Sequence, residues 1–392
     1  MVVIKEVSAK SILDSRKEKT ILVSIKTNLG KTFKASSPSG KSTGKYEVKT
    51  YKKSLEEDII TLKKFSEYFS EEILEEFDDL KRVEDILEGH IGGNTLFAFE
   101  SAVLKAIAEE KNKEIWEMVN PKLKEEKEKK FPRLVGNCIG GGKHSNISGK
   151  KPDFQEFLLI PDMTSPGNAL KTNKDGKERV QPLIKKKDNN FKGQKNDEDA
   201  WMTSLNEKEV LDVLNTLNLP LGLDVASSGF YNRGKYHYEN PMLKRDVDEQ
   251  LSYLANLIKN YNIFYIEDPF QEEDFEGFAK LLKKFPNSLI VGDDLTVTNS
   301  KRLKKAIDMK SINAIIVKPN QCGSLLEVKK VCEIAKENNI KMIFSHRSGE
   351  TSETILADLA FGFQADFLKC GITGKEREVK IKRLIEIEKK LK

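Results

Sequence analysis

Short apolar runs recur through the C-terminal two-thirds of the chain, and each ends in a polar side chain. The runs 262–266 and 289–291 are rich in β-branched and aromatic residues, which is typical of strands covered on both faces. Acidic pairs follow them, beginning at Glu267 and at Asp293. One helical stretch, 274–284, separates the runs, so the spacing predicts two parallel strands. Both acidic pairs are therefore expected on one rim of one sheet.

The same alternation continues to the C-terminus. From Glu267 onward, polar residues follow apolar runs every 23 to 28 residues, with helical stretches such as 325–337 between them. About eight such strand–helix units close into an α/β barrel, whose C-terminal rim would collect these side chains. An open doubly wound sheet is the alternative, but it does not explain a polar residue at the end of every strand. The expected strand ends are Asp224, Glu267, Asp293, Lys318, His346 and Lys369.

The N-terminal third has a different pattern. Residues 20–26 and 31–35 alternate like two antiparallel strands joined by a turn. Helical periodicity follows, with one apolar stripe over 55–65 and a second over 96–107 that continues towards Trp116. We therefore expect a small α+β domain in front of the barrel.

The charged run 124–130 cannot be buried and predicts a domain boundary. The predicted domains are an N-terminal α+β domain, 1–130, and a barrel domain, 131–392. Residues 160–200 contain scattered prolines and glycines together with many lysines, which favours an exposed loop with a broken helix. A basic site for a partner is the alternative for this segment.

Composition narrows the functional class. With 392 residues the chain exceeds one ordinary hydrophobic core, which agrees with two domains. Lys and Arg number 67 against 62 Asp and Glu, and such mixed charge is typical of a solvated surface rather than a nucleic-acid site. The 4 cysteines lack metal-site or disulfide spacing, and neither a signal segment nor a membrane-spanning run is found. A cytoplasmic protein without a membrane partner is expected.

Three carboxylates are predicted on neighbouring strand ends, namely Asp224, Glu267 and Asp293. Oxygen donors without clustered Cys or His favour a hard cation, magnesium or manganese. The alternative for each carboxylate is that it caps the helix that follows it. Three like charges on one rim repel one another unless a cation lies among them, which favours the metal site.

Two lysines, Lys318 and Lys369, end strands of the same rim. Buried lysines lose their charge readily, which suits a general base, and the alternative is that both are structural counter-ions to the acids. The stretch 346–349, with a histidine, an arginine and a serine, suits a phosphate or carboxylate group.

Taken together, these residues resemble the enolase family, whose members dehydrate 2-phosphoglycerate to phosphoenolpyruvate. The resemblance covers most of the chain, and only about 160–195 shows no match. It implies an enolase-type β/α barrel. The matching segments are 12–16, 38–44, 155–157, 222–228, 266–270, 292–299, 318, 320–321 and 345–351.

The resemblance also implies roles for individual residues. Asp224, Glu267 and Asp293 would hold a first magnesium ion, and Ser42 would ligate a second that arrives with the substrate, making two ions per active site. It further implies a homo-oligomer, a dimer or higher, that acts in glycolysis and gluconeogenesis.

The implied chemistry is an elimination. Lys318 would abstract the proton on C2 of the substrate, and Glu198, paired with Glu156, would protonate the departing C3 hydroxyl. The small phosphorylated hydroxy acid would be surrounded by further side chains. These are His144, His346 and Lys369 in the pocket, Gln155 beside it, and Arg347 with Ser348 at the phosphate.

Several family motifs are altered in this chain. Residues 17–19 replace a Gly-Asn-Pro, Asp199-Ala200 replaces two glycines after the acidic residue, Gly229 replaces a glutamate, and the glycine-rich loop carries Lys143. Lys41 and Lys143 add positive charge near the site. A paralogue that acts on another phosphorylated or carboxylated substrate therefore stays open.

Two other hypotheses belong to different functional classes. Residues 35–42 fit a relaxed phosphate-binding loop of nucleotide hydrolases, but such a loop opens a helix, whereas 43–51 alternate like a strand. A non-catalytic scaffold on the same barrel is the second, and a scaffold does not need Lys318, Glu198 and three metal carboxylates.

Overall fold

The N-terminal part of the molecule is a small antiparallel sheet covered by helices. The computed structural model describes residues 1–41 and 43–392. The sheet has the order β1-β2-β3, with both pairings antiparallel. Its strands are β1 (Ile4–Leu13), β2 (Lys19–Thr27) and β3 (Thr32–Ser36). Its helices are α1 (Leu55–Phe65), η1 (Ser66–Phe69), η2 (Phe77–Asp79), α2 (Leu80–Leu87), α3 (Gly93–Glu110) and α4 (Ile115–Val119).

The larger part is a closed barrel. Within the described residues, eight strands form the ring in the order β15-β14-β13-β12-β11-β7-β5-β4, and β15 pairs with β4 to close it. This confirms the expected fold class, a β/α barrel after a small α+β domain. The ring strands are β4 (Arg133–Gly140), β5 (Glu156–Leu159), β7 (Leu221–Asp224), β11 (Tyr265–Glu267), β12 (Leu289–Gly292), β13 (Ala314–Val317), β14 (Lys341–Ser345) and β15 (Phe367–Gly371).

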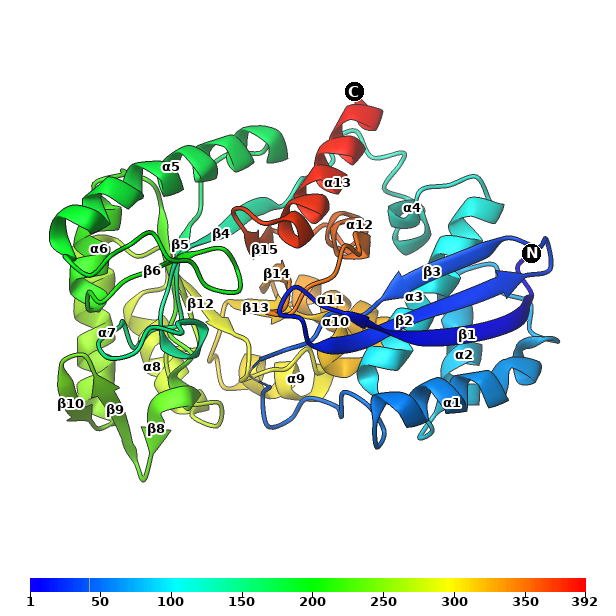
Figure 1. The fold of residues 1–392 in the computed structure, drawn as a ribbon, viewed down its shortest axis with the longest axis horizontal. Helices are drawn as coiled ribbons and strands as arrows, with labels where there is room; N and C mark the ends of the chain where they lie inside the picture. Colours follow the sequence, from blue (N-terminus) through cyan, green and yellow to red (C-terminus); the bar gives the residue numbers. More distant parts are fainter. Residues whose placement is uncertain (42) are drawn as a thin grey trace.

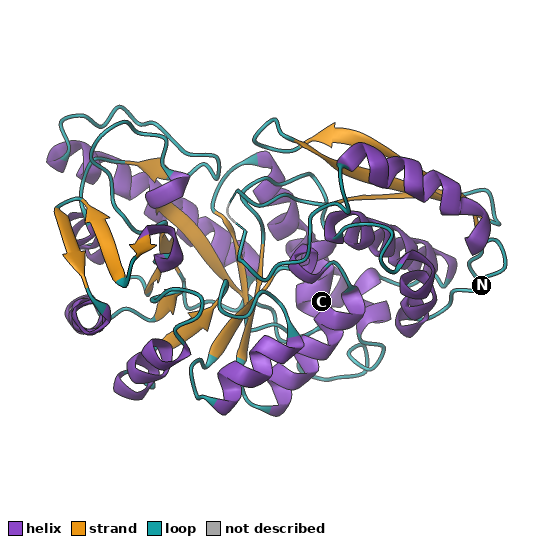
Figure 2. Ribbon diagram, turned by 90° about the horizontal axis from the view of Figure 1, so that it is seen from below, coloured by secondary structure: helices purple, strands orange, loops and turns teal. Residues whose placement is uncertain are grey.

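Helices surround this ring, and a small hairpin sheet extends from it. Figure 1 places the N-terminal sheet and the β8–β10 sheet at opposite ends of the molecule, and Figure 2 shows the same separation from below. The barrel helices are α5 (Pro166–Lys187), α6 (Glu207–Asn215), α7 (Val247–Tyr261), α8 (Phe275–Lys284), α9 (Ser300–Asp308), α10 (Pro319–Cys322), α11 (Leu325–Glu337), α12 (Ile355–Gly362) and α13 (Lys375–Leu391). The remaining short elements are η3 (Gly142–His144), β6 (Trp201–Met202), η4 (Ser227–Phe230), β8 (Tyr231–Asn232), β9 (Lys235–Glu239) and β10 (Met242–Arg245).

One ring strand runs against its neighbours. β5 pairs antiparallel with both β4 and β7, and the register sets Glu156 opposite Asp224. The next pairing, between β7 and β11, is parallel and sets Asp224 opposite Glu267. Because β5 is reversed, its first residue reaches the rim at which the other strands end. Glu156, Asp224 and Glu267 thus form one row across three strands.

The strand ends agree with the sequence pattern, with one shift. Asp224 and Glu267 are the last residues of β7 and β11, and Asp293 directly follows β12. Lys318 and His346 likewise directly follow β13 and β14. Lys369 instead lies inside β15, which continues to Gly371, because its backbone still pairs with β4 beyond that point.

Three expectations for local structure were wrong. Residues 166–187 form one helix, α5, because Ala169, Val180 and Ile184 bury one face against the barrel although Pro182 lies inside it. The stripe over 96–107 does not continue to Trp116, because α3 ends at Glu110 and Asn112 takes a left-handed φ of 49°. Residues 43–51 are turns rather than a strand; no helix opens there either, which disfavours the nucleotide-loop hypothesis.

A buried carboxyl on α6 gives a prediction about stability. Glu207 accepts a hydrogen bond of 2.6 Å from the backbone N–H of Asp153. Burial, with Asp153 nearby, raises the pKa of Glu207 from 4.5 to about 7. The folded state therefore holds this proton more tightly, so its stabilising contribution is full below pH 4.5 and is lost as the pH rises to about 7. The free energy of unfolding of the wild type should therefore fall by roughly 3 kcal/mol over this range, and Glu207→Gln should abolish this fall.

The measurement is the free energy of unfolding of both proteins between pH 5 and pH 8. The variant should gain stability relative to the wild type as the pH rises. Parallel profiles would show that Glu207 does not titrate in this range.

Candidate active site

A narrow pocket at the rim of the barrel gathers the predicted residues. Its volume is about 40 Å³, and among the described candidates only Glu267 does not line it. Ser42 lies outside the described residues. The candidates lining the pocket are His144, Gln155, Glu156, Glu198, Asp224, Asp293, Lys318, His346, Arg347, Ser348 and Lys369.

Lys369 is the centre of the acidic row. Its Nζ lies 3.0 Å from Asp224 Oδ2, 2.8 Å from Glu267 Oε2 and 3.2 Å from Glu156 Oε2. Glu267 contacts this ammonium and therefore belongs to the same site. Two further groups orient the row, because Gln155 Nε2 donates to Asp224 over 3.2 Å and the Tyr265 hydroxyl donates to Glu267 over 2.5 Å.

Asp293 is held on the neighbouring strand. Its Oδ2 accepts a hydrogen bond from Lys318 Nζ, and its Oδ1 accepts one of 3.0 Å from Gln321 Nε2. The buried Asp268 carboxylate accepts hydrogen bonds from the backbone N–H groups of Asp293 and Asp294 over 3.0 and 2.8 Å. Asp268 thus fixes the loop after β12.

The sequence pattern suggested that the two buried lysines lose their charge, but the pKa of each is raised. The pKa of Lys318 is raised because the attraction of Asp293 outweighs burial. The pKa of Lys369 is raised well above its usual range by Asp224, Glu156 and Glu267. Lys318 pairs with Asp293, and this raises the pKa of the lysine and lowers that of the carboxyl. The expected loss of charge followed from burial alone, without the carboxylates that lie on the same rim.

The rim offers the donor set that a hard cation requires. Among the described residues, two clusters of three side chains have ligand atoms that all lie within 4.8 Å of one another. One cluster is His144, Glu156 and Glu198, and the other is Asp268, Asp293 and Asp294. The predicted set of Asp224, Glu267 and Asp293 is split, since Lys369 pairs with the first two and Lys318 with the third. In kind the donors fit magnesium, because all three are carboxylates on successive strands.

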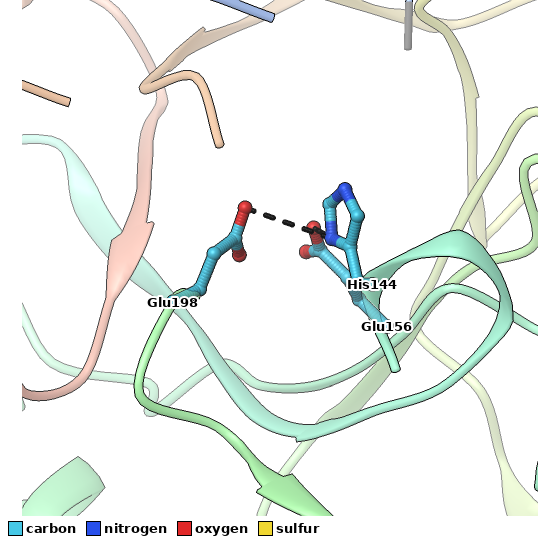
Figure 3. Close-up of side chains that lie close together, drawn as sticks. All are labelled: His144, Glu156 and Glu198. Carbon is cyan, nitrogen blue, oxygen red and sulfur yellow. Dashed lines mark ion pairs between the residues drawn. The ribbon is translucent and has the colours of Figure 1, made fainter. Parts of the chain in front are cut away.

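A second cluster joins Glu156 of the row to Glu198, on the loop before β6, and to two histidines, His144 of η3 and His346 after β14. His144 Nδ1 lies 3.2 Å from Glu156 Oε1 and 3.6 Å from Glu198 Oε1. Figure 3 shows the three side chains grouped together. His346 Nε2 lies 3.6 Å from Glu198 Oε2, which also accepts a hydrogen bond of 2.9 Å from Asn137. All of these groups are buried. The His144 Nδ1 atom thus lies within 3.6 Å of both acids.

The electrostatics separate the two acids of this cluster. Burial and the Glu198 charge raise the pKa of Glu156. The pKa of Glu198 is lowered, since His346, His144 and Arg377 together outweigh the effect of burial. The pKa of His144 is raised by its carboxylate neighbours, whereas burial lowers that of His346. Two carboxyls with opposite shifts in one pocket are typical of an acid–base site.

Arg347 and Ser348 reach the same pocket but have different partners. The Arg347 guanidinium forms a two-pronged ion pair with Glu47, at 3.0 Å to Oε2 and 3.2 Å to Oε1. The Ser348 hydroxyl accepts hydrogen bonds from the Lys41 backbone N–H over 2.7 Å and from Arg16 over 3.3 Å. Glu47 and the Lys41 backbone thus both contact the residues predicted to bind phosphate.

A larger cavity adjoins the pocket. Its volume is about 330 Å³, and it shares Gln155, Ala226 and Asp294 with the narrow pocket. The exposed Lys143 lines it, and a Cβ built on Gly229 would lie 3.7 Å from Lys143 Nζ. Two of the loop changes noted in the sequence, Lys143 and Gly229, therefore meet at this cavity.

Sequence reasoning missed several residues that support the site. Glu47 follows no apolar run and Asn137 lies inside one, so only the fold brings them to Arg347 and Glu198. The contact of Tyr265 with Glu267 could have been predicted, because residues two apart on a strand face the same side and Glu267 is two residues after Tyr265. Arg377 lies on α13, where its guanidinium donates to the Ser348 carbonyl over 2.7 Å.

Comparisons with known proteins agree with this geometry. Two family models match the chain, Enolase, N-terminal domain over residues 4–119 and Enolase, C-terminal TIM barrel domain over residues 128–392. A protein named Enolase from Methanosphaera stadtmanae is 37% identical, over 99% of this chain and 97% of its own length. Proteins of the same name from Pyrobaculum aerophilum and Methanothermobacter thermautotrophicus are 36% and 34% identical, over 90% and 99% of this chain and 87% and 97% of their own lengths. The chain belongs to the enolase family.

Proposed function

We propose that this enolase-family hydro-lyase dehydrates 2-phosphoglycerate to phosphoenolpyruvate. The observation that carries the proposal is the arrangement of one pocket. Lys318, directly after β13, and Glu198, on the segment before β6, line it together with the carboxylates Glu156, Asp224 and Asp293. An elimination needs a base and an acid on separate elements, together with stabilisation of the charge that develops between them.

Each proton transfer has a candidate residue. Lys318 directly follows β13, and its Nζ reaches the pocket beside Asp293, so it is the proposed base for the C2 proton. Because Asp293 raises the pKa of Lys318, the lysine would lose its proton once Asp293 turns to the magnesium ion. Glu198 is the proposed acid for the C3 hydroxyl; because its own pKa is lowered and that of Glu156 is raised, the proton that it delivers would come from Glu156. Asn137 and the two histidines fix its carboxylate, and Glu156 through His144 can resupply its proton. Lys369 would face the negative charge that develops on the substrate carboxylate.

The magnesium ions would be held by Asp224, Glu267 and Asp293, with Ser42 proposed as a ligand of the second. When bound, they would counter the rim carboxylates and stabilise the negative charge of the deprotonated substrate. Gln155, Gln321 and Tyr265 hold the carboxylates in position before any ion is present.

The phosphate end of the substrate is assigned to Arg347 and Ser348. A guanidinium fork binds a phosphate through two parallel hydrogen bonds, which is the geometry Arg347 already uses towards Glu47. Phosphorylated substrate should therefore be preferred over glycerate by about 100-fold or more in kcat/KM. A preference for a different hydroxy acid in the same screen would identify a paralogue with another substrate.

The remaining parts of the proposal concern cellular context. We place the reaction in glycolysis and gluconeogenesis in the cytoplasm, and we expect a homodimer or higher oligomer. Among the described residues no helix is both long and apolar enough to cross a membrane. Sedimentation of the purified chain tests the oligomeric state.

Tyr265 provides a test of the metal site that does not depend on turnover. Its hydroxyl donates to Glu267 from inside the barrel, so Tyr265→Phe removes one orienting hydrogen bond and little volume. We expect about a tenfold loss of magnesium affinity in calorimetric titration. Tyr238→Phe is the matched control, because its buried hydroxyl instead donates to Gln250, which also bonds the Pro269 carbonyl. Equal affinities in both variants would remove Glu267 from the metal site.

A further inference from the structure

The proposed acid stands at the tip of a tight turn. Lys195 and Trp201 pair across the base of this turn, and the Asn196 backbone N–H donates to the Ala200 carbonyl over 2.9 Å. The Asn196 side chain closes the turn, since its Oδ1 accepts hydrogen bonds of 2.9 Å from the backbone N–H groups of Glu198 and Ala200. The position of Glu198 therefore depends on how this turn is anchored.

Asp199, which follows the acid, has a left-handed backbone. Its φ is 61°, a conformation that glycine adopts without strain and that other residues adopt at a cost. The enolase pattern has glycine at this position, so the backbone shape is kept while the residue type has changed. The side chain that replaces the missing glycine must offset the strain through its contacts.

Those contacts come mainly from α5, the helix whose sequence matched no family motif. Lys177 is 3% exposed, and its Nζ lies 2.9 Å from Asp199 Oδ2. The same ammonium donates to the Asp199 backbone carbonyl and to the Thr373 hydroxyl, and that hydroxyl in turn donates to Asp199. Lys177 thus grips the residue after Glu198 at both its carboxylate and its backbone.

The pair also joins three parts of the site. Thr373 follows β15, the strand that carries Lys369, and Trp201 Nε1 donates to the Lys177 carbonyl over 2.9 Å. A Cβ built on Gly371 would lie 3.1 Å from the Glu198 carbonyl oxygen, so the turn already packs closely on β15. A shift of Asp199 would therefore move Glu198 relative to the pocket.

We propose that Lys177 and Asp199 form a positioning pair that holds Glu198 at the distance needed to protonate the leaving hydroxyl. This inference rests on the proposed function and adds to it a device carried by this chain's own residues. Glycine would adopt the left-handed backbone at position 199 without any contacts. Here an ion pair and a backbone hydrogen bond from Lys177 hold Asp199 in the same conformation. Neither residue lines the pocket, so both act through Glu198.

A purely structural ion pair makes a different prediction. If Lys177 only fastens α5 to the barrel, its loss lowers stability and affects both halves of the reaction equally. If it positions Glu198, its loss affects the departure of the C3 hydroxyl while Lys318 still removes the C2 proton. Exchange of the C2 proton with deuterated solvent reports the first half of the reaction, and phosphoenolpyruvate formation reports both.

The experiment compares Lys177→Met with Lys195→Met in the full chain with magnesium and 2-phosphoglycerate. Lys195 is the matched control, because it also pairs with Asp199, at 3.0 Å, but its side chain is 39% exposed. We expect Lys177→Met to slow phosphoenolpyruvate formation by roughly 100-fold, the effect of a small displacement of a catalytic group. C2 exchange should change less than about threefold, and Lys195→Met should change neither rate by more than that.

A double variant separates positioning from unfolding. Lys177→Met with Asp199→Gly removes both charges and restores the glycine, so it should fold as shown by thermal unfolding and recover part of the lost dehydration. Parallel loss of both rates in folded Lys177→Met, or equal effects of the two lysine variants, would overturn the inference.

An inactive wild type would instead count against the proposed function. In that case crystal structures of wild type and Lys177→Met decide the positioning question alone. The hydrogen bond from Asn137 to Glu198, 2.9 Å in the wild type, should be lost in the variant. An unchanged distance would contradict the inference.

Discussion

Lys318→Ala should abolish both halves of the reaction while leaving the fold intact. The ammonium of Lys318 reaches the pocket at the end of a strand whose other residues are all buried, and no other lysine except Lys369 lines that pocket among the described residues. Lys369 cannot replace it, because three carboxylates hold its ammonium. We expect C2 exchange and dehydration to fall by about 10,000-fold, the upper range for loss of a general base.

Lys301→Ala is the control for this variant. Lys301 is an exposed residue at the start of α9, so its removal should leave both rates unchanged. In Lys318→Ala, Asp293 loses its lysine partner but keeps its hydrogen bond from Gln321. Thermal unfolding checks that this change does not destabilise the barrel. C2 exchange at the wild-type rate in Lys318→Ala would remove this residue from the role of base.

Glu198→Gln should separate the two halves. The amide has the shape of the carboxylate and can still accept the hydrogen bond from Asn137, but it cannot deliver a proton to the C3 hydroxyl. We expect dehydration to fall by about 1,000-fold, and C2 exchange to persist within about tenfold of the wild type. The two rates are measured on the same sample, by phosphoenolpyruvate formation and by deuterium incorporation.

Asp197→Asn is the matched control for Glu198→Gln. Asp197 is the adjacent acid of the same turn, but it is 29% exposed and pairs with Lys41 over 3.3 Å. Its loss should have a much smaller effect on dehydration. If Glu198→Gln dehydrates at the wild-type rate, or loses exchange to the same extent, Glu198 is not the acid.

Much of this site could be predicted from the sequence because the barrel converts a one-dimensional pattern into a ring. Uniformly apolar runs identify strands covered on both faces, and a polar residue after each run must reach the shared rim. Asp224, Glu267, Asp293 and Lys318 were found in this way, and each lies at the end of its strand or directly after it, whereas their roles stay predictions. Glu156 depended on the family resemblance, because it begins a reversed strand rather than ending a parallel one.

Other features depend on tertiary contacts that no local pattern shows. The buried face of α5 includes Asn173 and Lys177, so its apolar stripe is interrupted, and the reason for burying a lysine lies in Asp199 and Thr373. The charge state of Lys318 depends on Asp293, which reaches it from another strand. Periodicity reports which side of an element is covered, but it does not report what covers it.

The domain boundary at residue 130 stays a prediction. The two family models leave residues 120–127 unmatched, and these lie between α4 and β4.

The most direct test is the formation of phosphoenolpyruvate by the purified chain. With magnesium and 2-phosphoglycerate it should proceed at an ordinary enzymatic rate, roughly 1 to 1,000 per second, and it should stop when EDTA is added and resume when magnesium is restored. If no phosphoenolpyruvate forms from the folded protein with magnesium present, or if its formation persists in EDTA, the proposed function is contradicted.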